Sequence, residues 1–198
     1  MQFLTNLRDK IVFFFRTHGD SRRSDVFLGA LSFAESSFFP IPPDFFLMPL
    51  VAIRSGRDWF YLAALTTITS VLGGFFGYAI GSFLFSYIGA PIISFYHLQD
   101  GFQTVELKFQ TSAFITIFLA GFTPIPYKVF TIAAGVFHVA LFPFFLASFL
   151  GRGGRFFIVA YVMKRYGEKI SGIFLRWFNL VAIVTAVIIL LTLLYILF

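Results

Sequence analysis

Long apolar segments alternate with short charged ones along the chain. Residues 60–87 and 178–198 are uncharged runs, and each exceeds the roughly 20 apolar residues that a membrane-spanning helix needs. Two further apolar segments, 26–53 and 109–137, are broken by prolines, and a third, 143–164, contains arginines. The pattern predicts an all-α polytopic membrane protein whose last span is a C-terminal transmembrane helix, 171–198.

The charged segments predict the connections between these helices. Apolar residues recur at helical spacing over residues 1–20 and are followed by the basic sequence SRRSD, so we expect an amphipathic surface helix and linker over residues 1–24. Residues 54–59 read as a polar turn and residues 89–108 as a polar loop. Residues 164–176 form a basic loop.

Composition supports the membrane assignment. The chain is 59% hydrophobic and 12% charged, whereas soluble domains carry about 25% charged residues. Its net charge of +6 comes from bases that flank apolar segments, which indicates a positive-inside orientation rather than a nucleic-acid partner. We therefore expect a multi-pass protein of the cell membrane with a cytoplasmic N-terminus.

Two proline-rich breaks lie inside apolar segments. Proline removes a backbone donor and clashes with the preceding turn, and the freed carbonyls cannot face lipid. The economical structure is a re-entrant hairpin, in which the chain enters the membrane, turns at the prolines and leaves on the same side. The predicted tips contain Pro40, Pro42 and Pro43 in the first hairpin and Pro124 and Pro126 in the second.

The two breaks belong to an internal repeat. Residues 40–46 lie over 124–130, and the sequence Ser70–Gly73 lies over Ser148–Gly151. Each repeat, about 28–89 and 110–167, would be one hairpin plus one full span. An odd number of crossings gives the two copies opposite orientations, which is the inverted-repeat plan of many transporters.

Five ionisable residues are predicted at membrane depth, where a charge costs about 2.5–3.5 kcal/mol on insertion scales. We expect them to line one polar cavity, with Asp44 and Lys128 close together. Arginine suits an anionic phosphate head group, and the carboxylates would accept protons or hold the cations. The alternative is a set of purely structural ion pairs. The five residues are Glu35, Asp44, Lys128, Arg152 and Arg155.

Other motifs are structural or absent. Gly73, Gly77 and Gly81 form a GxxxGxxxG face, which is typical of close helix packing. The three histidines have no metal-ligand spacing, and the sequence contains no cysteine and no GxxxxGK[ST] phosphate loop. We therefore expect no metal, no cofactor and no enzymatic activity.

These motifs resemble the DedA superfamily (the VTT, or SNARE-associated, domain), most closely its YqaA-type branch. The resemblance covers roughly residues 25–170 and rests on ESSFFPIPPD (35–44), GGFFGYAIG (73–81), AGFTPIPYKVFTIAAGV (120–136) and LGRGGR (150–155). It implies two opposed re-entrant hairpins packed against transmembrane helices. It also implies movement of lipids across membranes, in some members driven by the proton motive force.

By position, Glu35 and Asp44 match the acidic residues of the family, and Lys128 matches its second arginine. Phe122 stands where many members have the first arginine. Either Arg152 and Arg155 compensate, or the substrate differs.

The sequence thus predicts a transporter that flips or scrambles an anionic lipid, a polyprenyl phosphate or a phospholipid, with coupling to protons left open. The alternatives are a proton or small-ion antiporter and a non-transporting membrane scaffold.

Overall fold

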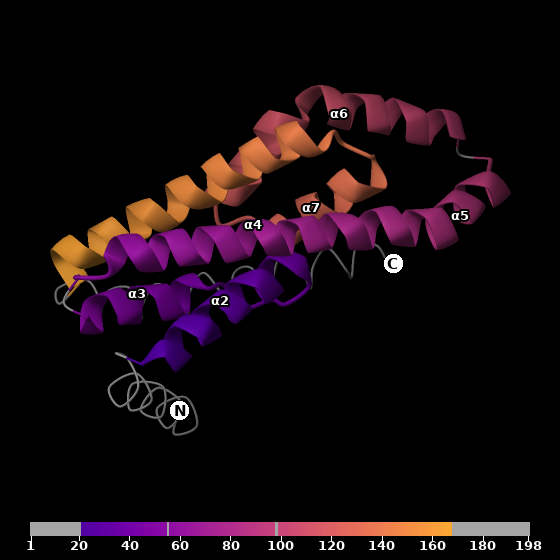
Figure 1. Ribbon diagram of the computed structural model, residues 1–198. Helices are drawn as coiled ribbons and strands as arrows, with labels where there is room; N and C mark the ends of the chain where they lie inside the picture. The colour runs from indigo at the N-terminus through magenta and orange to yellow at the C-terminus, as the bar shows by residue number, and fades with distance from the viewer. Residues whose placement is uncertain (1–20, 55, 98, 168–198) are drawn as a thin grey trace, which may run out of the picture.

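The computed structural model describes residues 21–54, 56–97 and 99–167, and within them every regular element is helical (Figure 1). This confirms the all-α class. The elements are α2 (Arg22–Ser37), α3 (Asp44–Ile53), α4 (Trp59–Leu84), the π-helical η1 (Phe85–Gly89), α5 (Ala90–Phe95), α6 (Gln99–Phe122), α7 (Tyr127–Val136) and a last helix, Leu141–Gly167.

Three helices are long and apolar enough to cross a membrane. They are Trp59–Phe95, in which α4 continues through η1 and α5, then Gln99–Phe122 and Leu141–Gly167. The expected amphipathic segment over residues 1–20 and the expected C-terminal transmembrane helix, 171–198, lie outside the described residues.

Helices end where the prolines stand. The first break separates α2 from α3, and Pro43 is the N-cap residue of α3 with φ −68°. The second break separates α6 from α7, which begins directly after Pro126. At the first break, the backbone N–H groups of Phe38 and Phe39 both donate to the Ala34 carbonyl at 2.8 Å, which closes the end of α2 without continuing it.

The chain reverses at both breaks, so each break joins two arms: α2 and α3 at the first, α6 and α7 at the second (Figure 1). Helix α4 packs mainly against the first arm of the first pair, α2, and the second arm of the second pair, α7. From its start to about Gly73, α4 packs closely against α2: a Cβ on Gly73 would collide with the Phe33 carbonyl. Beyond Gly73, α4 packs closely against α7: a Cβ on Gly81 would collide with the Ile132 carbonyl. The two proline-rich tips therefore meet near the middle of α4.

The last helix, Leu141–Gly167, is flanked in the same manner by the other two arms. Its first half contacts α6, where a Cβ on Gly151 would lie 2.6 Å from the Phe118 carbonyl oxygen. Its second half contacts α3, where a Cβ on Gly167 would lie 3.3 Å from the Ala52 side chain.

Two apolar clusters fill the space between the arms and the long helices. One joins α3 to α4 and the last helix, and the other joins α6 and α7 to the last helix. Their buried members are, in the first, Leu28, Leu47, Met48, Leu50, Val51, Leu62, Ala63, Phe156, Ala160 and Met163, and in the second Ala113, Ile117, Ala120, Tyr127, Ala134, Val139, Phe144 and Ala147.

Two local predictions are wrong. Residues 89–108 are not a loop, because α5 and the first part of α6 occupy most of this range. Pro91 is the second residue of α5 and follows the π-helical turn η1 within the continuous helix Trp59–Phe95. The linker assigned to residues 21–25 is the start of α2, which places Asp25 in the first turn, where the helix dipole favours a negative charge.

Candidate functional site

The first buried ion pair joins Arg152 to Glu35 where the end of α2 meets the last helix. Both residues are almost fully enclosed, at 2% and 9% exposed. The Arg152 Nε also donates to the Ser70 hydroxyl at 2.6 Å, and the Ser36 and Ser70 hydroxyls lie 2.7 Å apart. The guanidinium is thus held by a carboxylate and a hydroxyl chain from two helices.

Aromatic rings hold the same guanidinium from α7 and from its own helix. Its central carbon lies 5.0 Å from the centre of the Tyr127 ring and 4.6 Å from that of Phe156. Rings at this range attract a cation electrostatically, and more strongly when water is excluded. Arg152 is therefore fixed in both position and orientation.

The second pair joins Arg155 to Asp44 at 2.6 Å. The other Arg155 nitrogen donates to the Thr123 carbonyl at 2.7 Å. Arg155 therefore connects the start of α3 to the tip between α6 and α7. The second Asp44 oxygen, Oδ1, is buried and has no hydrogen-bond partner among the described residues, so this carboxylate can accept a further hydrogen bond.

Lys128 does not pair with Asp44 as the sequence predicted. Its ammonium donates instead to the Phe39 carbonyl at 3.2 Å, which ties the two tips together. Asp44 and Lys128 occupy equivalent places in the sequence repeat, but their helices pack on different partners. Helix α7 packs against α4, whereas α3 packs against the last helix. Asp44 therefore faces Arg155, and Lys128 is left partly exposed.

Arg152 and Arg155 lie near the middle of the last helix, and Ser70, which accepts a hydrogen bond from Arg152, lies near the middle of α4. Counting from Trp59, Ser70 is the twelfth residue of α4, and counting from Leu141, Arg152 is the twelfth residue of the last helix. At 1.5 Å per residue each is about 17 Å from the start of its helix, close to half the roughly 30 Å hydrocarbon thickness.

Four further residues of this cluster were not singled out from the sequence: Ser36, Ser70, Tyr127 and Phe156. Ser70 did carry a signal, because it begins one of the repeat landmarks. Tyr127 lies in the other landmark, residues 124–130, and Ser36 lies in the motif ESSFFPIPPD, whereas Phe156 carried no signal. Tyr127 and Ser148 are fully buried, and their hydroxyls lie next to each other.

The glycine face of α4 packs against the arms of both tips. Gly73 meets α2, whereas a Cβ on Gly77 or Gly81 would collide with Thr131 or the Ile132 carbonyl of α7. These glycines let the arms approach closely enough to bring the charges together. Among the described residues, no group of three His, Asp, Glu or Cys side chains could hold a metal.

Comparison with known proteins gives the family. The model of the VTT domain, the domain of DedA proteins, matches residues 41–165. The chain belongs to the DedA family. The matched range contains Asp44, Lys128, Arg152 and Arg155 of this DedA protein, and Glu35 lies just before it.

Two relatives carry no functional description. An uncharacterized protein of Haemophilus influenzae is 38% identical over 144 residues, which cover 73% of this chain and 74% of the relative. An uncharacterized protein of Histophilus somni is 33% identical over 150 residues, covering 76% and 78%. No solved structure matches the chain. Assignment to the YqaA-type branch stays a prediction.

Proposed function

We propose that this DedA protein flips or scrambles an anionic lipid, a polyprenyl phosphate or a phospholipid, across the cell membrane. One observation carries the proposal: two arginines are held by carboxylates where two proline-rich tips meet, midway along the long helices. A charge at membrane depth is costly and marks a functional site by default. No chemical change of the lipid is part of the proposal.

The proposed topology is an inverted repeat of two re-entrant hairpins. Helices α3 and α7 have ten residues each, so they span about 15 Å, half of the hydrocarbon core. Helix α4 and the last helix each pack against one arm of each hairpin. Helix α4 contacts α2 along its first half and α7 along its second, and the last helix contacts α6 along its first half and α3 along its second. In this topology residues 54–58 and 164–176 are cytoplasmic with the N-terminus, and residues 90–108, 138–142 and the C-terminus are outside.

The proposed mechanism exchanges one anion for another. In the described structure Glu35 and Asp44 hold Arg152 and Arg155, and in the proposed cycle these pairs re-form whenever no phosphate is bound. A lipid phosphate, like a carboxylate, has anionic oxygens that can accept two hydrogen bonds from one guanidinium. Protonation of a carboxylate would release its arginine for the phosphate, and loss of that proton would restore the pair and expel the lipid.

The surroundings of the charges favour a lipid over a soluble ion. Lys128 lies among apolar side chains that the tips leave exposed, and such surface is suited to hydrocarbon. A phosphate could reach the cations while its tails stay in the membrane. The exposed apolar residues of the two tips are Phe38, Phe39, Ile41, Phe122, Ile125 and Val129.

The test is translocation of labelled lipid in proteoliposomes, with and without a pH gradient. We expect the protein to accelerate movement of an anionic lipid, Arg155→Gln to abolish it, and Arg165→Gln, at an exposed site near the end of the last helix, to leave it unchanged. Proton-driven cation flux without lipid movement would reject the proposal in favour of an antiporter. Neither activity in folded protein would indicate a scaffold.

A further inference from the structure

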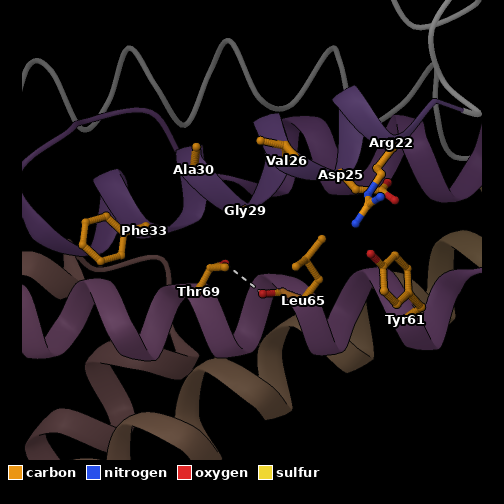
Figure 2. A pocket seen from close by; sticks show the side chains of 9 residues that line it. All are labelled: Arg22, Asp25, Val26, Gly29, Ala30, Phe33, Tyr61, Leu65 and Thr69. Carbon is orange, nitrogen blue, oxygen red and sulfur yellow. Dashed lines mark hydrogen bonds between the residues drawn. The ribbon is translucent and has the colours of Figure 1, made fainter.

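A groove between α2 and α4 is separate from the paired charges. Its volume is about 460 Å³, within the range of small-molecule sites. Figure 2 shows the side chains that line it, from both helices. They are Arg22, Asp25, Val26, Gly29, Ala30, Phe33, Tyr61, Leu65 and Thr69.

The groove has one polar end and an apolar length. Figure 2 shows Arg22 and Tyr61 together at one end and Phe33 at the other. Between them the Thr69 hydroxyl donates to the Leu65 carbonyl of its own helix at 2.8 Å, so its methyl group faces Gly29. Gly29 lets α2 approach α4 closely at the floor of the groove, since a Cβ there would lie 3.2 Å from that methyl.

The polar end carries excess positive charge. Asp25 is the acidic residue of the lining, and its carboxylate already accepts a bond from Arg54 at 2.6 Å. Within the described residues Arg22 forms no ion pair. Among the described residues, the start of α2 and the turn between α3 and α4 carry Arg22, Arg23, Arg54 and Arg57 together with Asp25 and Asp58.

The position of the polar end matches a membrane interface. Arg22 begins α2, and Trp59 and Tyr61 lie in the first turn of α4. Tryptophan and tyrosine are enriched where a membrane meets water, and arginines there attract anionic lipids. Val26 on the rim is 67% exposed, as expected for a surface that faces hydrocarbon.

We propose that this groove binds one membrane lipid with an anionic head group. The phosphate lies between the Arg22 guanidinium and the Tyr61 hydroxyl, and one acyl chain lies along Gly29 and Leu65 toward Phe33. This is a binding site only, and it stands whether or not the protein moves lipids.

The experiment places a photo-crosslinking amino acid at Ala30, a lining residue, in the full chain. Nanodiscs contain equal amounts of phosphatidylglycerol and phosphatidylcholine, and adducts are identified by mass spectrometry. We expect phosphatidylglycerol adducts to dominate. Arg22→Gln lowers them about tenfold, the effect of one lost charge-assisted hydrogen bond. Lys108→Gln, which removes an exposed cation on α6 outside the lining, leaves them unchanged.

A second variant fills the groove. Gly29→Leu should remove the adducts of both lipids, and thermal unfolding in detergent checks that the variant is folded. If this variant does not fold, the comparison of Arg22→Gln with Lys108→Gln still decides the matter. Equal labelling by both lipids with no effect of Arg22→Gln would overturn the proposal. So would adducts with residues 168–198 or with a second copy of the chain in place of lipid.

Discussion

At the scale of single residues, the two arginines differ in how tightly they are held. Arg152 has 3% of its side chain exposed and lies against two aromatic rings, whereas Arg155 has 19% exposed and contacts the tip backbone. We therefore expect Arg152 to contribute more to folding and Arg155 to be the first cation that a lipid phosphate reaches.

Glu35→Gln leaves the Arg152 charge buried without its carboxylate. Removing one partner of a buried pair costs about 3–5 kcal/mol, so this variant should lower the thermal unfolding temperature strongly. Glu35→Gln combined with Arg152→Met, which removes both charges, should recover most of that loss. The contrary result is a double variant no more stable than the single one.

Asp44 provides a matched test of which cation it faces. Asp44→Asn and Arg155→Gln should be strongly coupled in a double-mutant cycle, because the two side chains form an ion pair. Asp44→Asn and Lys128→Gln should add to within about 0.5 kcal/mol, as unpaired sites do. Unfolding in detergent measures both cycles. Coupling of Asp44 to Lys128 instead of Arg155 would restore the pairing expected from the sequence.

At the scale of elements, prolines and glycines are where the sequence was most informative. Proline chemistry is local, so PIPP and TPIP predicted where helices end. The partner of each charge depends on which long helix each arm follows, and that is a long-range choice with no local signal. The helices over residues 89–108 were missed because exposed polar residues on a helix resemble a loop in composition.

Gly81→Leu should prevent α7 from packing on α4. The added side chain would meet the Ile132 carbonyl, and backbone cannot yield as a flexible side chain can. We expect loss of folded protein, measured by size-exclusion chromatography of detergent extracts. Gly101→Leu is the matched control, because no atom lies within 4 Å of a Cβ at that position. Equal yields of the two variants would mean that the packing on α4 is not required.

At the scale of the whole molecule, the proposal requires that both arms of each hairpin leave the membrane on one side. The chain has no cysteine, so single cysteines report sidedness cleanly. Arg57→Cys should react with an impermeant reagent from the cytoplasmic side and Gly101→Cys from the outside. Labelling of both from the same side would contradict the topology.

The central claim is that the paired charges form a transport site and are not merely a structural lock. The most direct measurement is translocation of an anionic lipid in proteoliposomes by the Asp44→Asn, Arg155→Gln double variant. Its stability is measured on the same preparation. Removing both charges leaves no stranded ion, so the variant should be folded, and it should fail to move the lipid. A folded double variant that translocates lipid at the rate of the parent protein would contradict the account.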